Sequence, residues 1–219
     1  MNDQTDFLAQ LIRHHDLIDR MTGSMRTLLH LVQQGSADPA ELKNYLDFHQ
    51  NFMVLFHHER EEVLFRALEE KGLSGKQGPL FLLREEHREM RQMIETLYTM
   101  ISSVTDPEAV SKNVTTLSHW IWEHVDKENS VLFTEVPRHI PQDTRETDLK
   151  VYLEEEERFA PWLIRVERCT QRHPPMRPDI IRGPGCVQCR HFTVRCDGME
   201  HEWWREEDWK NLHIRMGGD

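Results

Sequence analysis

The chain has 219 residues and a formal net charge of −11 at pH 7. This length allows one sizeable core, or one domain with a small appendage, and we favour the second. The acidic balance argues against a nucleic-acid partner, because phosphate binding needs a basic surface. The N-terminus lacks a basic start followed by an apolar run, and no stretch approaches the roughly 18 apolar residues of a membrane span. We therefore expect a soluble, cytoplasmic protein that binds neither nucleic acid nor membranes.

Four helices are predicted in the first 137 residues from an apolar period of about 3.6 residues. Asp38-Pro39 and Asp106-Pro107 each supply a cap and a first-turn proline, and Pro137 closes the last helix. Connections between the helices are short, so we expect an all-α fold, an antiparallel up-down-up-down four-helix bundle. The predicted helices cover residues 5–34, 38–71, 79–104 and 106–137.

The fourth helix carries two ionisable residues where a helix of a soluble protein is usually apolar. At about 100° per residue, His124 and Glu128 fall on the same stripe as Val114, Ile121 and Val131, whereas His119 points to the opposite side. A carboxylate on a core-facing stripe is costly unless it is paired or bound to a metal. Because His-x-x-x-Glu lets two side chains of one helix converge, the pair predicts metal ligation.

The second helix contains a doublet of the same kind. His57 and Glu61 share a face with the apolar residues Leu46, Met53, Leu64 and Leu68, while His58 and Glu62 share a face with polar ones. The helical period therefore places His57 and Glu61 inside and His58 and Glu62 in solvent. This choice reproduces the pair on the fourth helix.

Helices one and three repeat the same apolar spacing, in which His15 corresponds to His87. Phase alone places His14 slightly nearer the centre of the first stripe, so His14 stays open as an alternative to His15. Together the four helices offer four imidazoles and two carboxylates, a set that can surround two metal ions bridged by carboxylates. Such mixed nitrogen and oxygen ligation suits iron, or manganese less often. The predicted ligands are His15, His57, Glu61, His87, His124 and Glu128.

These motifs resemble the hemerythrin-like HHE cation-binding domain over about residues 5–136. The residues that carry the resemblance are His15-x-Leu17-Ile18, HHEREEVLF at 57–65, EEH at 85–87 and HVDKENSVLF at 124–133. The resemblance implies a non-haem di-iron site in a four-helix bundle that meets dioxygen, nitric oxide or peroxide, or that handles iron. It implies the same six ligands.

Two departures from the family pattern bear on the ligand set. Oxygen-carrying hemerythrins place a further histidine four residues after the third-helix ligand, where this chain has Arg91. A set of four histidines and two glutamates is closer to the iron-sulfur-repair and sensor-like members. The second-helix motif is one residue shorter between its glutamate pair and Leu-Phe than in many relatives, which keeps His58 and Glu62 as alternates.

The rest of the chain divides into an additional helical segment, residues 138–171, and an extension, residues 172–219, that begins with a linker rich in proline and glycine. The four cysteines lie in the last quarter of the chain, which without an export signal favours metal or redox use. A second metal site, for zinc or an iron-sulfur centre, is one interpretation, and reduced structural cysteines are another. The candidate ligands are Cys186, Cys189, Cys196 and His201, with Cys169, His173 and His191 as substitutes.

Three functions follow from these patterns. The leading hypothesis is a di-iron protein that detects, stores or scavenges a small oxidant. The second is an oxidoreductase or iron-sulfur-repair-like enzyme, in which Arg91 would hydrogen-bond a ligand at the same centre. The third is a module that binds a protein partner through the extension, where Trp203, Trp204 and Trp209 stand among charges, and whose metal is structural.

Overall fold

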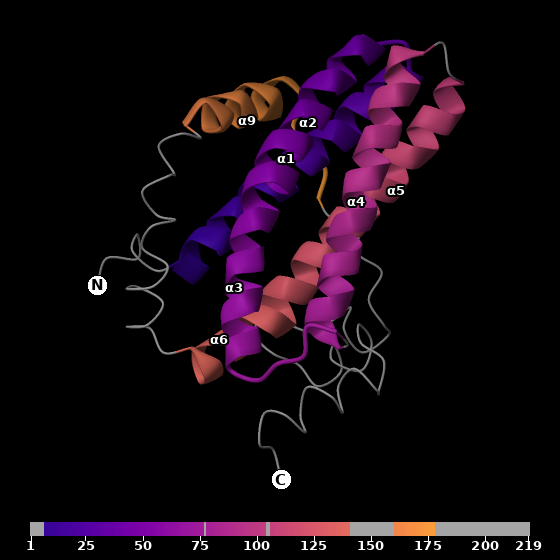
Figure 1. The fold of residues 1–219 in the computed structure, drawn as a ribbon. Helices are drawn as coiled ribbons and strands as arrows, with labels where there is room; N and C mark the ends of the chain where they lie inside the picture. Colours follow the sequence, from indigo (N-terminus) through magenta and orange to yellow (C-terminus); the bar gives the residue numbers. More distant parts are fainter. Residues whose placement is uncertain (1–6, 77, 104–105, 141–159, 178–219) are drawn as a thin grey trace, which may run out of the picture.

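The computed structural model describes residues 7–76, 78–103, 106–140 and 160–177, and Figure 1 shows how their elements are arranged. Every regular element within these ranges is a helix, which confirms the all-α fold class. In the same ranges no helix combines the length and the apolar character that crossing a bilayer requires.

From α1 to α6 the helices follow one another with short connections. Helices α2, η2 and α3 are continuous, as are α5, η3 and α6, and both η2 and η3 are π-helices, while η1 is a short 3₁₀ turn. The bounds are α1 Phe7–Gln33, η1 Pro39–Glu41, α2 Leu42–Phe48, η2 His49–His57, α3 His58–Glu70, α4 Pro79–Ser102, α5 Pro107–Lys127, η3 Glu128–Leu132, α6 Phe133–His139 and α9 Ala160–Arg172.

Two helical stretches begin where the sequence predicts, each after an aspartate cap followed by a proline. Asp38 Oδ1 accepts a hydrogen bond from the backbone N–H of Ala40, and Asp106 Oδ1 accepts one from Glu108, at 2.9 and 3.0 Å. Each aspartate thereby satisfies a donor that the first turn leaves without an intrahelical partner. The end of the fourth stretch differs from the prediction, because Pro137 lies inside α6, which continues to His139.

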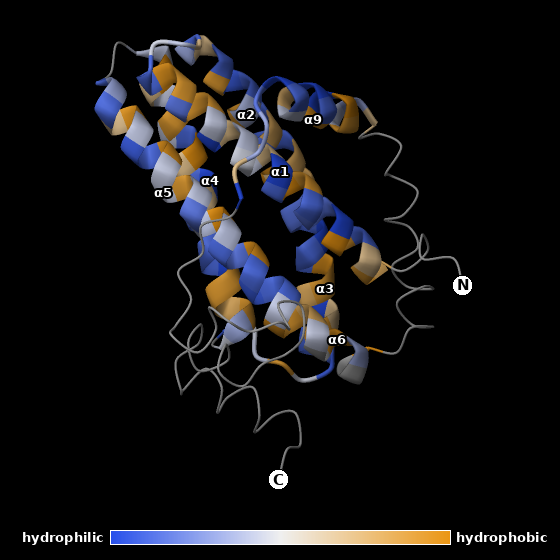
Figure 2. Ribbon diagram, turned by 180° about the vertical axis from the view of Figure 1, so that it is seen from behind, coloured by the Kyte–Doolittle hydropathy of each residue, from blue (hydrophilic) through white to orange (hydrophobic). Residues whose placement is uncertain are grey.

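The core consists of two apolar clusters. The first apolar cluster includes Ile18, Met21, Leu46, Phe52, Met90, Ile94, Val114 and Ile121. The second apolar cluster includes Phe7, Leu11, Leu64, Phe65, Leu80, Leu83, Val131 and Phe133. Figure 2 shows hydrophobic and hydrophilic residues mixed along the helices that supply these clusters.

Buried or half-buried ionisable residues separate the two clusters along each helical stretch. His15 lies between Leu11 and Ile18 in the sequence, and Glu61 precedes Leu64. On the other two stretches His87 stands between Leu83 and Met90, and Glu128 between Val125 and Val131. A polar layer therefore interrupts the apolar interior, which is unusual because burying charged groups is costly.

Helix α9 packs against α1 (Figure 1), and the segment 173–177 that follows it continues along α1. The backbone N–H of Met176 donates to the carbonyl of Gly23 at 3.1 Å, and Thr27 Oγ1 donates to the carbonyl of Pro174 at 2.7 Å. A Cβ atom at Gly23 would lie 2.3 Å from the carbonyl oxygen of Met176. Glycine at position 23 thus permits the close approach of two segments that are far apart in the sequence.

Candidate metal centre

Seven buried or half-buried side chains from four helical stretches meet in the polar layer. They are His15 on α1, His57 at the end of η2, His58 and Glu61 on α3, His87 on α4, His124 on α5 and Glu128 at the start of η3. Their donor atoms fall into two groups, within each of which the atoms lie no more than 4.8 Å apart. Glu61 belongs to both groups.

The first donor group, His15, His57, Glu61 and Glu128, is fully enclosed. His15 Nε2 lies 3.1 Å from Glu61 Oε1 and 3.2 Å from Glu128 Oε2. His57 Nε2 lies 2.9 Å from the same Glu61 oxygen. Both carboxylates are 0% exposed, so water does not solvate them.

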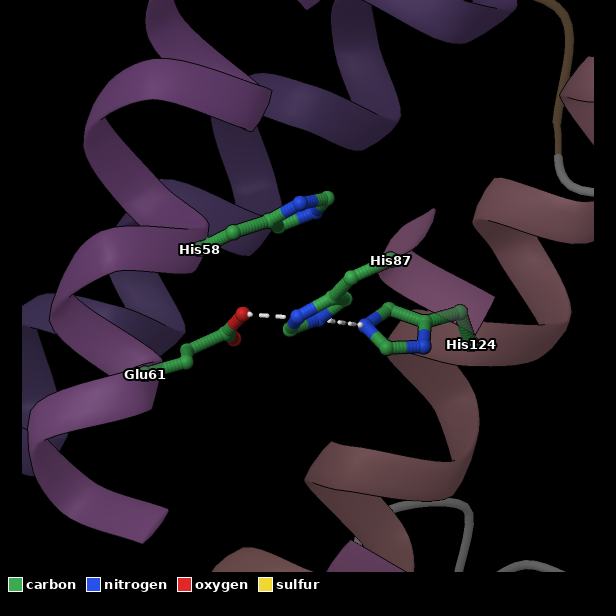
Figure 3. Close-up of side chains that lie close together, drawn as sticks. All are labelled: His58, Glu61, His87 and His124. Atoms are coloured by element: carbon green, nitrogen blue, oxygen red, sulfur yellow. Dashed lines mark hydrogen bonds and ion pairs between the residues drawn. The ribbon is translucent and has the colours of Figure 1, made fainter. Parts of the chain in front are cut away.

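The second donor group, His58, Glu61, His87 and His124, lies on the α4 side (Figure 3). His87 Nε2 is 3.3 Å from Glu61 Oε2 and 2.9 Å from His124 Nε2, so the His87 ring stands between the other two side chains. The His58 ring stacks on the His87 ring. His87 is 12% exposed, and this makes the second group the one that solvent reaches.

Further hydrogen bonds hold two of the imidazoles in place. His124 Nδ1 lies 2.8 Å from Glu86 Oε2, and Lys127 contacts the other oxygen of Glu86. His15 Nδ1 donates to Asn129 Oδ1, also at 2.8 Å. Both rings therefore turn Nε2 toward the centre, as do metal-binding histidines whose other nitrogen is held by a carboxylate or an amide.

Burial and the carboxylates of Glu61, Glu86 and Glu128 together set the pKa values of the imidazoles in the polar layer. Burial opposes the charged form of His15, but Glu128 and Glu61 outweigh it and raise the pKa of His15 to about 9. Burial likewise opposes charge on His124, yet Glu128 and Glu86 raise its pKa to about 10. Burial dominates at His57 and lowers its pKa to about 3. Protonated His15 and His124 can therefore neutralise the negative charge of the neighbouring glutamates when no metal is bound.

The donor set fits metal ions. Several buried donor atoms form no well-directed hydrogen bond with any of the described residues: both oxygens of Glu128, Oε2 of Glu61 and Nδ1 of His58. Buried polar atoms in this situation are costly, and a cation would satisfy them. Imidazole nitrogens combined with carboxylate oxygens suit iron or manganese.

The structure brings all six predicted ligands together, and it corrects the placement of His58. His58 was predicted to face solvent, but it is 5% exposed and belongs to the second donor group. The cause is the π-helix η2, because a π-turn contains more residues than an α-turn. The helical face on which Leu46 and Met53 lie therefore does not continue at the α-helical period beyond η2, where His58 stands. Glu62, the other alternate ligand on this helix, is half-buried and belongs to neither donor group. Its carboxylate pairs with Arg84 at 2.8 Å.

His14, the open alternative to His15, and His119, predicted to point away from the site, both lie outside the two donor groups. His14 is buried, but it packs against Phe52 and Phe56, and its Nδ1 lies 3.4 Å from His57 Nδ1. His119 is half-buried and contacts Trp122 edge to face. The signals that could have identified His58 are the doublet itself and the arginine at position 91, where oxygen carriers have a histidine.

The cysteine-containing site predicted in the extension lies outside the described residues, because Cys186, Cys189, His191, Cys196 and His201 all fall there. Of the substitutes, Cys169 is half-buried on α9, and burial raises the pKa of its thiol. His173 Nδ1 accepts a hydrogen bond from Tyr45 Oη at 2.7 Å. In the part of the chain that the structure describes, neither belongs to a group of three or more metal-donor residues.

Comparison with known proteins agrees with this geometry. The family model of the hemerythrin HHE cation binding domain matches residues 6–136. Searches of curated proteins and of solved structures gave no match. The match spans more than half of the chain and contains all seven residues of the polar layer. The chain therefore belongs to the hemerythrin HHE cation-binding domain family.

Proposed function

We propose that the chain is a non-haem di-iron protein that binds, senses or scavenges dioxygen, nitric oxide or peroxide, or that handles iron. The observation that carries this proposal is the pair of donor groups that share Glu61. One ion would be held by the first donor group and the other by the second, with the carboxylate of Glu61 between them. Manganese suits the same ligands and is the alternative metal.

Bound iron would supply the exchange between ferrous and ferric states. The chain supplies the rest: Glu86 and Asn129 orient two imidazoles, and the apolar clusters on either side limit the access of water. Enclosure strengthens every charge interaction in the site and protects a reactive ligand from side reactions.

We also propose that the four helical stretches form an antiparallel up-down-up-down bundle. The order of the two apolar clusters along the chain supports this arrangement. Helix α1 runs from the second cluster to the first, the stretch α2 to α3 runs from the first to the second, and α4 and then α5 to α6 repeat the alternation. Successive stretches that cross the same polar layer in opposite directions are expected of such a bundle.

An oxidoreductase is the second candidate. It is favoured by the partial exposure of His87, since a reactant that must enter and leave needs one accessible metal position. Turnover with a reductant would distinguish catalysis from reversible binding.

Metal analysis of the purified protein, with an absorption spectrum before and after exposure to air, tests the proposal. We expect about two irons per chain, as in other carboxylate-bridged helical bundles. His124→Ala and Glu61→Ala should lower the iron content, whereas His119→Ala should not. Equal loss from all three substitutions would contradict the assigned site.

A further inference from the structure

A cavity of about 750 Å³ lies at the end of the helical bundle where α1 and α4 end and where η1 and α5 begin (Figure 1). Leu28 on its wall follows His15 by 13 residues on α1. At a helical rise of about 1.5 Å per residue, this spacing places Leu28 about 20 Å beyond His15 along the helix. The cavity is therefore separate from the metal centre.

The inner part of the cavity wall is apolar. Leu28, Leu29 and Leu42 on this wall are buried and belong to the first apolar cluster. Val32 and Val110, also on the wall, pack against the same cluster but are only half-buried. These side chains keep apolar surface in contact with water, and an apolar molecule in the cavity would remove it from water.

The opposite end of the bundle is closed by apolar side chains from its connections. Leu73 between α3 and α4 is 5% exposed, Ile140 after α6 is 2% exposed, and both belong to the second apolar cluster. By contrast, the connection between α1 and η1, residues 34–38, contributes only Ala37 to the first apolar cluster. Protein interiors contain few voids larger than a water molecule. A cavity of this size beside the core therefore indicates a binding site.

The size and the charges of the wall restrict the ligand. Sites for drug-sized molecules usually measure about 300–1,000 Å³ and are mostly apolar, with a few polar groups. The described wall has two ionisable residues of opposite charge, Lys43 and Glu108. Lys43 already pairs with Asp47 at 2.8 Å, and Glu108 is exposed in the first turn of α5, where the helix dipole offsets its charge. The wall therefore favours an uncharged ligand.

A hydrogen bond between α1 and α5 places polar groups on the same wall. Gln33 Nε2 donates to Ser111 Oγ at 2.7 Å, and both residues line the cavity. Gln33 is exposed, so this pair stands where the cavity meets solvent. An amide and a hydroxyl together can donate to and accept from a polar group of a ligand.

We infer that this cavity binds an uncharged, largely apolar small molecule, whose polar group forms a hydrogen bond with the pair of Gln33 and Ser111. The apolar wall supplies the affinity, and the polar pair fixes the orientation of the ligand. This inference goes beyond the proposed function and does not depend on it, because none of the metal-donor residues lies on the described wall.

Titration of the full chain with Nile red tests the inference, because this neutral, apolar dye fluoresces more strongly in apolar surroundings. We expect saturable binding of about one dye per chain with a Kd on the order of 10 µM, as for a drug-sized ligand of ordinary efficiency. Val110→Glu should raise the Kd at least about tenfold, because binding would then remove a carboxylate from water. Val32→Trp should weaken binding by a different cause, since the larger side chain occupies part of the cavity.

The polar pair and the charge of the ligand are tested separately. Ser111→Ala should raise the Kd for Nile red about three- to tenfold, since the carbonyl group of the dye would lose a hydrogen-bonding partner. The anionic dye anilinonaphthalene sulfonate should bind at least about tenfold more weakly than Nile red, because the wall has no excess positive charge to pair with it. Tighter binding of the anionic dye would overturn the inferred charge of the ligand.

Ile164→Glu is the control for binding of the dye elsewhere on the surface. Ile164 on α9 is 63% exposed, the largest exposure among the large hydrophobic side chains that the structure describes, and it does not line the cavity. The Kd of this variant should change less than about twofold. Absence of saturable binding, or a Kd that both Val110→Glu and Val32→Trp leave unchanged, would overturn the site. Weakening by Ile164→Glu as large as that by Val110→Glu would place the dye on α9 and would overturn it as well.

Discussion

The imidazole rings of His58 and His87 lie parallel, with their centroids 3.7 Å apart and 6° between their planes. The two rings come from different helices, and His124 approaches His87 from a third. Burial, and then the neighbouring His87, lowers the pKa of His58 well below its usual value. His58 is therefore neutral at pH 7, the form of histidine that binds metal ions.

His58→Ala should lower the metal content of the protein, because it removes a donor of the second group. We expect the ratio of metal to chain to fall from about two toward about one, since three donors poorly hold a metal that prefers four or more. Atomic absorption on dialysed protein measures this. His14→Ala is the control, being buried but outside both groups, and a loss of metal as large as that in His58→Ala would contradict the assignment.

The helical period predicted much of this arrangement and failed at identifiable places. An α-helical phase placed His124 and Glu128 on one face, and the structure has His124 Nε2 3.4 Å from Glu128 Oε2. The same phase failed for His58 because η2 changes the register just before it. Nor could a period reveal the contact of Gly23 with Met176, because that contact depends on two segments remote in sequence.

Glu86→Gln should weaken metal binding although Glu86 belongs to neither donor group. Its carboxylate holds His124 Nδ1 at 2.8 Å and thereby orients the ring. Loss of such a partner typically costs about 10- to 100-fold in metal affinity. Competition with a chelator of known affinity measures the change. Glu85→Gln is the neighbouring control, because Glu85 pairs only with Arg88 among the described residues, and an equal effect would rule out a role in orienting His124.

Gly23→Ala should lower the stability of the protein, because a clash with Met176 outweighs the higher helix propensity of alanine. Inside a helix, alanine is favoured over glycine by about 1 kcal/mol. At position 23, however, the added Cβ would lie 2.3 Å from the carbonyl oxygen of Met176, so the segment 173–177 must move. We expect a lower Tm and faster hydrogen exchange of the Met176 amide, whose N–H donates to the carbonyl of Gly23. In a chain that lacks residues 173–219 the contact is gone, and Gly23→Ala should raise the Tm. A higher Tm of Gly23→Ala in the full chain would show that the segment 173–177 does not pack on α1.

His49 should make the stability of the metal-free protein depend on pH. This side chain is buried, its Nδ1 donates to the carbonyl of Tyr45 at 2.8 Å, and Thr22 Oγ1 lies 3.0 Å from its Nε2. Burial lowers the pKa of His49 from 6.5 to about 4. The unfolded chain therefore binds a proton at this residue between these two values while the folded chain does not, and the folded state loses stability as the pH falls from about 6.5 toward 4.

Comparison of the protein with its His49→Gln variant isolates this contribution, because His57 and His58 titrate in the same direction in both. At pH 7 the variant should be less stable by about 1–3 kcal/mol, since it disturbs two buried hydrogen bonds. Between pH 7 and pH 5 the difference should shrink by about 2 kcal/mol, because only the protein with His49 gives up the stability that comes from keeping this imidazole neutral. Urea unfolding of the metal-free proteins at the two pH values measures the difference, and a constant gap would mean that His49 is not held neutral in the fold.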